Sequence, residues 1–168
     1  MPFTIRNESK YMENLTVSNN LVVAGPEKHN IRLLVDTATT NGVLHNCLNT
    51  ESNTIFLIPQ LSVGKQIINL PSSLNNFGVN FTFITVPGFG NTISQDVEIK
   101  CVGADKVGGE LTTGINGNTA NITPAALVTI ESAALNGNYI KLFCIGSLNG
   151  LTQQWYIYTY TSSAASFS

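Results

Sequence analysis

The chain has 168 residues, of which 43% are hydrophobic and only 11% are charged, with a net charge of −2; a soluble domain of average composition carries about 25% charged residues. The length fits one domain, and the apolar content is high enough to exclude a wholly disordered chain. The eight Lys and Arg residues are spread singly, which excludes a nucleic-acid binder, and no apolar run approaches the roughly 18 residues of a transmembrane helix.

Strand-like segments recur along the chain, whereas helix signals are nearly absent. Segments rich in Val, Ile, Thr, Phe and Tyr lie at 31–35, 54–58, 66–70, 79–86, 96–102, 126–131, 139–145 and 154–160. Breaks rich in Gly, Asn and Ser separate them, and four of these breaks contain an Asn-Gly pair, at 41–42, 116–117, 136–137 and 149–150. Asn-Gly supplies the positive φ that tight turns require. This spacing is typical of a sandwich or barrel of short strands.

Apolar and polar residues alternate within several of these segments. In segment 96–102, Val97 and Ile99 point to one face, and Glu98 and Lys100 point to the other. One face of each strand is therefore expected to be buried and the other wet, as in antiparallel sheets that pack face to face. The sequence predicts an all-β chain, an antiparallel β-sandwich.

The chain divides into three parts. Residues 1–25 contain a short β pattern that has no neighbouring strand in sequence, and Gly25-Pro26 then breaks the chain, so this part is expected to be an N-terminal arm or linking strand. Residues 26–161 form the single β-sandwich domain. Residues 162–168 are rich in Ser and Ala and are expected to form a flexible tail.

Motifs for catalysis, metal binding or cofactor binding are missing from the sequence. His29 and His45 are not at metal-ligand spacing and lie in polar stretches typical of solvated side chains. Cys101 and Cys144 lie in strand-like segments, which favours small buried hydrophobic residues over a disulfide or a reactive thiol. We therefore expect no catalytic residue, no metal and no cofactor; a glycosidase with two carboxylates on neighbouring strands is the enzyme class left open.

The aromatic segment 154–160 is the strongest candidate for a contact surface. Alternation places Trp155 and Ile157 on one face and Tyr156, Tyr158 and Tyr160 on the other. A row of tyrosines suits packing within the sheet or between subunits, and it also suits stacking against a sugar. Both interpretations stay open at this stage.

The order of several short motifs over residues 50–160 resembles a module of viral surface proteins. A strand that ends in Leu70-Pro71 is followed by a polar loop, Gly78 and the strand Phe81-Thr82-Phe83-Ile84. Next come a strand at 97–101, a Gly-Gly turn at 108–109, a strand at 127–132, and a closing Asn149-Gly150 and Trp155-Tyr156. This pattern is similar to the compact β-sandwich modules of phage tail fibres and decoration proteins and of minor capsid proteins of large DNA viruses.

The resemblance implies a structural virion protein, a minor capsid, decoration or fibre subunit, with a jelly-roll type of sandwich and no catalytic residues. It implies a homo-oligomer, with a trimer favoured, that contacts other capsid or fibre proteins in a virion assembled in the host cytoplasm. The alternative is a carbohydrate-binding module on a virus surface that recognises host glycans. Neither function involves nucleic acid or a membrane span.

Overall fold

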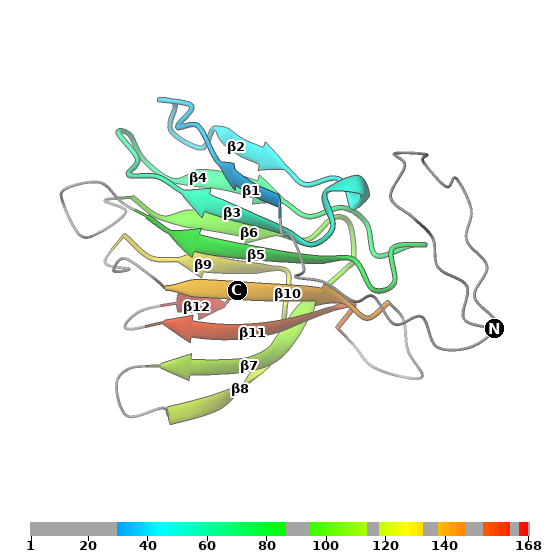
Figure 1. Ribbon diagram of the computed structural model, residues 1–168. Coiled ribbons are helices and arrows are strands. Elements are labelled where there is room, and N and C mark those ends of the chain that lie inside the picture. The colour runs from blue at the N-terminus through cyan, green and yellow to red at the C-terminus, as the bar shows by residue number, and fades with distance from the viewer. Residues whose placement is uncertain are drawn as a thin grey trace, which may run out of the picture.

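Two β-sheets lie face to face and enclose the hydrophobic core (Figure 1). The computed structural model describes residues 30–86, 95–113, 118–132, 138–146, 153–161 and 165–167. Within these ranges the larger sheet has seven strands, in the order β1 (Asn30–Leu33), β3 (Thr54–Ile58), β5 (Asn80–Thr85), β10 (Tyr139–Cys144), β11 (Trp155–Thr161), β7 (Val107–Thr113) and β8 (Asn118–Ala125). The smaller sheet has five, in the order β12 (Ala165–Phe167), β9 (Leu127–Ile130), β6 (Val97–Lys100), β4 (Gln66–Asn69) and β2 (Val43–Asn46). A short 3₁₀ helix, η1 (Asn49–Glu51), lies between β2 and β3.

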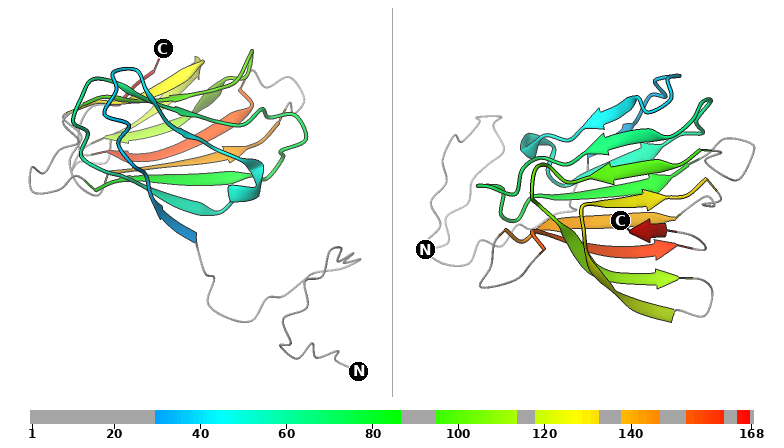
Figure 2. Two further views of the ribbon diagram at one scale, coloured as in Figure 1. Left: turned by 90° about the horizontal axis from the view of Figure 1, so that it is seen from above. Right: turned by 180° about the vertical axis from the view of Figure 1, so that it is seen from behind.

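The first six strands alternate between the two sheets along the chain (Figure 2). The strands β1, β3 and β5 run parallel to one another in the larger sheet, and β2, β4 and β6 run parallel in the smaller one. Each odd strand and the even strand that follows it form one coil, and the three coils stack as in a β-solenoid. Parallel neighbours need a long crossover connection, and here the strand in the opposite sheet supplies it.

The expected β-sandwich is confirmed, but the expected antiparallel pairing is wrong for half of the ladders in the described sheets. Five ladders are parallel and five are antiparallel. Alternation along a strand reports which face is buried, but it carries no information on the direction of the neighbouring strand. The jelly-roll connectivity, which belongs to antiparallel folds, is not confirmed.

Each of the eight predicted strand segments contains a strand, and four further strands were not predicted. The strand β7 contains Gly108 and Gly109, so the expected Gly-Gly turn is wrong, and the polar β8 contains Pro124. The strand β2 has only four residues, and β12, in the stretch 162–168, pairs with β9. The expected arm, residues 1–25, lies outside the described residues.

Large inward-facing side chains of the larger sheet fill the space between the sheets. Phe56, Phe81, Phe83 and Trp155 are fully buried, and the rings of Phe81 and Trp155 stack at 5.9 Å between centroids. The smaller sheet contributes Ile68, Val97, Ile99, Val128 and Ile130 from the opposite side. The alternation in segment 96–102 is confirmed for Val97 and Ile99.

One of the expected Asn-Gly turns lies in the described part of the chain. Asn41 has a φ of 56°, and the amide of Gly42 donates a hydrogen bond to the carbonyl oxygen of Thr39. The pairs at 116–117, 136–137 and 149–150 lie outside the described residues.

Gly109 makes the parallel pairing of β7 with β11 possible. Its φ is +142°, in the region that favours glycine, and a Cβ on it would lie 2.3 Å from the carbonyl oxygen of Ile157. The ladder between β7 and β8 shifts its register at this position, as at a β-bulge. A side chain at position 109 would therefore push the backbones of β7 and β11 apart.

Replacing Gly109 with Ala should lower the free energy of unfolding by about 2 kcal/mol or more, because backbone strain and a backbone clash add. Urea unfolding followed by Trp155 fluorescence measures this change. The neighbouring Gly108→Ala is the matched control, since a Cβ there would meet only the side chain of Gln153, at 3.2 to 3.4 Å, and should cost less than about 1 kcal/mol. Equal losses in the two variants would contradict the proposed role of Gly109.

Candidate functional site

The outer surface of the larger sheet carries many apolar side chains, called here the apolar face, and Asn80, Thr82 and Lys141 point outward among them. Its members are the outward-facing Ile31, Leu33, Ile55, Leu57, Ile84, Tyr139, Phe143, Tyr156 and Tyr158. Strand register places Leu33, Leu57, Ile84 and Tyr139 in one row across four strands. The exposed fractions of Ile31 and Leu33 are 67% and 59%. The outer surface of an antiparallel sheet that faces water usually carries fewer apolar side chains than this.

The tyrosines singled out from the sequence lie on this face. Tyr156 is half-buried and Tyr158 is 46% exposed, while Trp155 and Ile157 point into the core as expected. Tyr160 belongs to the same strand and is in register with Tyr139; its side chain is outside the part that the structure describes. In the next row Tyr158 lies between Lys141 and Glu110.

The outer surface of the smaller sheet is different in chemistry. Its central residue is Glu98, whose carboxylate accepts hydrogen bonds from Lys65 Nζ (2.5 Å) and Lys100 Nζ (2.8 Å). Burial raises the pKa of Glu98, but the hydrogen bonds and charges of Lys100 and Lys65 outweigh it and hold that pKa below its ordinary value. Thr129 lies beside Glu98 in register. This face therefore presents ion pairs and a hydroxyl at its centre, with Val43, Ile67 and Leu127 beside them in register.

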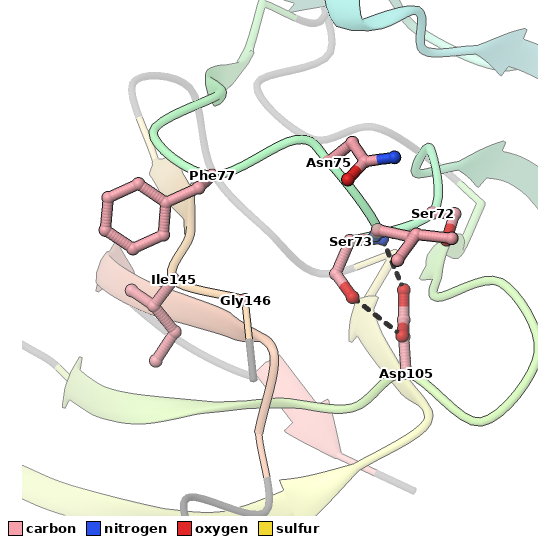
Figure 3. Close-up of a pocket in the computed structure, with 8 residues that line it drawn as sticks. Ser72, Ser73, Asn75, Phe77, Asp105, Ile145 and Gly146 are labelled. Carbon is pink, nitrogen blue, oxygen red and sulfur yellow. Dashed lines mark hydrogen bonds between the residues drawn. The ribbon is translucent and has the colours of Figure 1, made fainter. Parts of the chain in front are cut away.

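A pocket of about 490 Å³ opens at one end of the sandwich, where three loops meet (Figure 3). Its lining comes from the loop between β4 and β5, the turn between β6 and β7, and the residues after β10: Ser72, Ser73, Leu74, Asn75, Phe77, Asp105, Ile145 and Gly146. Sequence reasoning missed this pocket because it treated all three segments as connections. The available signal was Leu74 and Phe77, two large apolar residues within a loop otherwise rich in Ser and Asn.

Asp105 joins two of these loops. Its carboxylate oxygens accept hydrogen bonds from the Ser73 amide (2.7 Å) and the Ser73 hydroxyl (2.9 Å), as the dashed lines of Figure 3 show. The third segment is held by a hydrogen bond from the Gly78 amide to the Cys144 carbonyl oxygen (2.9 Å). The pocket walls are thus tied together by bonds within the protein.

The cysteines are free and poorly suited to chemistry as thiolates. Cys47 and Cys144 are buried, and burial raises the pKa of both thiols. Burial, and to a smaller extent the charge of Asp105, raises the pKa of Cys101 to about 12. The sequence-based interpretation of Cys144 as a small buried residue is confirmed.

Within the described ranges, no group of three His, Cys, Asp or Glu side chains is arranged to hold a metal ion. In the same ranges, no helix has the length and hydropathy to cross a membrane. No family model, curated protein or solved structure matches the chain.

A hydrogen-bonded cluster around Glu51 covers the core at the edge formed by β1 and β2. The Glu51 carboxylate accepts hydrogen bonds from Arg32 Nη1 (2.5 Å) and from the Leu48 amide (2.9 Å), and it lies 2.9 Å from His45 Nε2. The His45 ring also packs on Phe56, with 4.9 Å between centroids. The expectation of a solvated His45 is wrong, since only 12% of its side chain is exposed; His29 lies outside the described residues.

The Glu51 carboxylate should make stability depend on pH. Burial raises the pKa of Glu51, but the Leu48 amide, His45 and Arg32 outweigh it and lower the pKa below the ordinary 4.5. A carboxylate of lowered pKa stabilises the fold fully above its unfolded-state pKa, and this contribution is lost as pH falls through the folded-state pKa. We expect Glu51→Gln to be less stable than the wild type by about 1–2 kcal/mol at pH 7, with a difference that shrinks from about pH 5 to pH 3.

Urea unfolding at a series of pH values measures this difference. The control variant Glu131→Gln removes a carboxylate outside the cluster and should leave the pH profile of the wild type nearly unchanged. A deficit in Glu51→Gln that is constant between pH 7 and pH 3 would show that the carboxylate charge is not what stabilises this edge.

Proposed function

We propose that this chain is a structural subunit of a virus particle, a minor capsid, decoration or fibre protein, that assembles through the apolar face. The observation that carries the proposal is the difference between the two outer surfaces of the sandwich. The larger sheet exposes aliphatic and aromatic side chains across five strands, whereas the smaller sheet centres on the ion pairs of Glu98. Polar residues lie on both outer surfaces, but only the larger sheet, within the described residues, has an apolar row that crosses four strands, from Leu33 to Tyr139. A face that stayed in water would not be expected to carry such a row.

The composition of the apolar face is that of a protein interface. Interface cores are depleted in charge and enriched in Tyr, Phe and other large side chains, and soluble monomers rarely expose contiguous apolar patches beyond a few hundred Å². Charged residues make up only 11% of the whole chain, so few charges need to be desolvated when such surfaces are covered. Both points support a role in assembly. The proposal assigns no catalytic residue to this chain.

The oligomer proposed is a homotrimer, within a virion that assembles in the host cytoplasm. The order of motifs over residues 50–160 supports the viral assignment, and three free cysteines are compatible with a reducing compartment. Residues 1–25 are proposed as the arm that links the sandwich to neighbouring capsid or fibre proteins. At Asn30 the chain enters β1, which is an edge strand of the larger sheet within the described residues, so this arm would start at the edge of that sheet.

A second candidate function is recognition of host carbohydrates. The observation that favours it is the pocket of Figure 3, because an exposed aromatic ring and a carboxylate share one concave surface there. Tyr156 and Tyr158 are the weaker candidates for a glycan contact, since they lie on the apolar face that a protein partner would cover.

Two lysines on the apolar face should disrupt assembly. The double variant Leu33→Lys and Tyr158→Lys changes two exposed side chains, so the fold should be retained. Assembly should be lost, because a dry interface would have to bury two unpaired charges. Size-exclusion chromatography with light scattering should give the mass of a trimer for the full-length wild type and that of a monomer for the variant.

The matched control is Val43→Lys with Thr129→Lys, which places two lysines on the outer surface of the smaller sheet. This control should keep the mass of the wild type. A monomeric wild type at high micromolar concentration, or equal masses for the two double variants, would overturn assembly through the apolar face. The viral assignment is tested separately: a chain-specific antibody should label intact purified particles, and failure to label would count against it.

A further inference from the structure

We propose that the pocket between the three loops is a binding site for a neutral saccharide, with Phe77 as the stacking surface and Asp105 and Asn75 as the groups that bind hydroxyls. Its volume of about 490 Å³ falls within the range of about 300–1,000 Å³ that is usual for small-molecule sites. The lining residues belong to loops at the end of the sandwich, and none of them is a member of the apolar face. The proposal rests on the second candidate function above and does not depend on the assembly role.

Phe77 provides an apolar platform at the mouth of the pocket. Its side chain is 70% exposed, although it belongs to a loop that is otherwise tightly hydrogen-bonded. The ring edge lies near Gly146, because a Cβ placed on that glycine would be 3.7 Å from Phe77 Cδ2. In Figure 3 Phe77 and Ile145 lie on one side of the pocket, and Ser73 and Asp105 lie on the other. The electron-rich face of an aromatic ring attracts the C–H groups of a sugar ring.

Asp105 has acceptor sites that no donor among the described residues occupies. An ionised carboxylate has about four lone-pair sites, and Ser73 occupies one on each oxygen. The remaining sites accept two hydroxyl groups, in the short charge-assisted bonds that carboxylates form with O–H donors. Because Ser73 holds both oxygens, the carboxylate is oriented before a ligand arrives.

Asn75 adds a donor and an acceptor at the rim. Among the described residues its side-chain amide has no hydrogen-bond partner, and its backbone is left-handed with a φ of 62°. The turn that presents it is closed by hydrogen bonds from the Asn76 amide to the Ser73 carbonyl (3.1 Å) and from Asn76 Nδ2 to the Ser72 carbonyl (2.6 Å). The rim is therefore ordered without the Asn75 side chain, which leaves that amide available to a ligand.

The charge of the site selects a neutral ligand. Asp105 forms no ion pair with a basic side chain in the described part of the chain, and no Lys or Arg lines the pocket. An acidic sugar would meet the Asp105 carboxylate without a compensating cation. A hexose or N-acetylhexosamine unit combines the apolar C–H face and the adjacent hydroxyls that this arrangement fits.

Saturation-transfer NMR on the full-length chain tests the proposal with four neutral disaccharides: maltose, cellobiose, lactose and N,N′-diacetylchitobiose. At least one should bind saturably, and binding should weaken about tenfold in Phe77→Ala and several-fold in Asn75→Gly. Both variants should fold normally, since Phe77 is exposed and glycine accepts the left-handed φ of Asn75. Sialyllactose serves as the acidic comparator and should bind more weakly than lactose.

Val43→Ala, on the outer surface of the smaller sheet, is the control and should leave saccharide binding unchanged. Tyr158→Ala tests the weaker glycan candidate on the apolar face. The proposal is overturned if none of the four disaccharides binds, if binding is unaffected by both pocket variants, or if it is lost in Tyr158→Ala instead. Tighter binding of sialyllactose than of lactose would overturn the choice of a neutral ligand. Light scattering of the same samples reports the oligomeric state independently, so failure of this site and failure of the assembly proposal are distinguishable.

Discussion

The stack of aromatic rings between the sheets is the interaction on which the rest of the structure depends. Phe56 and Phe81 come from the coiled half of the chain, where parallel strands alternate between sheets, and Trp155 comes from the half that follows. The contact of Phe81 with Trp155, at 5.9 Å between centroids, joins the two halves inside one core. Without this shared core, the inward-facing side chains of the coils would need another surface to pack against.

The positions of both candidate surfaces follow from this core. Because the large rings of β3, β5 and β11 point inward, the residues between them point outward, and Ile55, Tyr156 and their apolar neighbours form part of the apolar face. The loops that connect the strands gather at the ends of the sandwich, and three of them meet at the pocket of Phe77 and Asp105. The fold thus separates a broad surface suited to a protein partner from a small concave site suited to a soluble ligand.

The strands that escaped sequence analysis share a physical reason. The pattern of β7 is broken by two glycines, and β8 is polar and contains a proline. The strand β7 is held in the sheet by β11, which is distant in sequence, and β8 is held by its pairing with β7. The close approach of Gly109 to Ile157 requires the absence of a side chain, so the residue that looked like a turn is the one that permits the pairing. Sequence analysis missed the contact of Glu51 with His45 for the same reason, because this contact depends on how η1 folds back on β2.

The sequence by itself determined the fold class, the inward and outward faces of the strongest strands, and the position of Tyr156 and Tyr158 on an outer face. These properties depend on local alternation, which has a period of two residues and needs no knowledge of neighbours. The tertiary structure alone decided which strands run parallel, how the apolar residues of β1, β3, β5, β10 and β11 combine into one face, and which loops form the pocket. These features depend on contacts between residues far apart in the chain, and alternation within one strand does not specify which strand pairs with it.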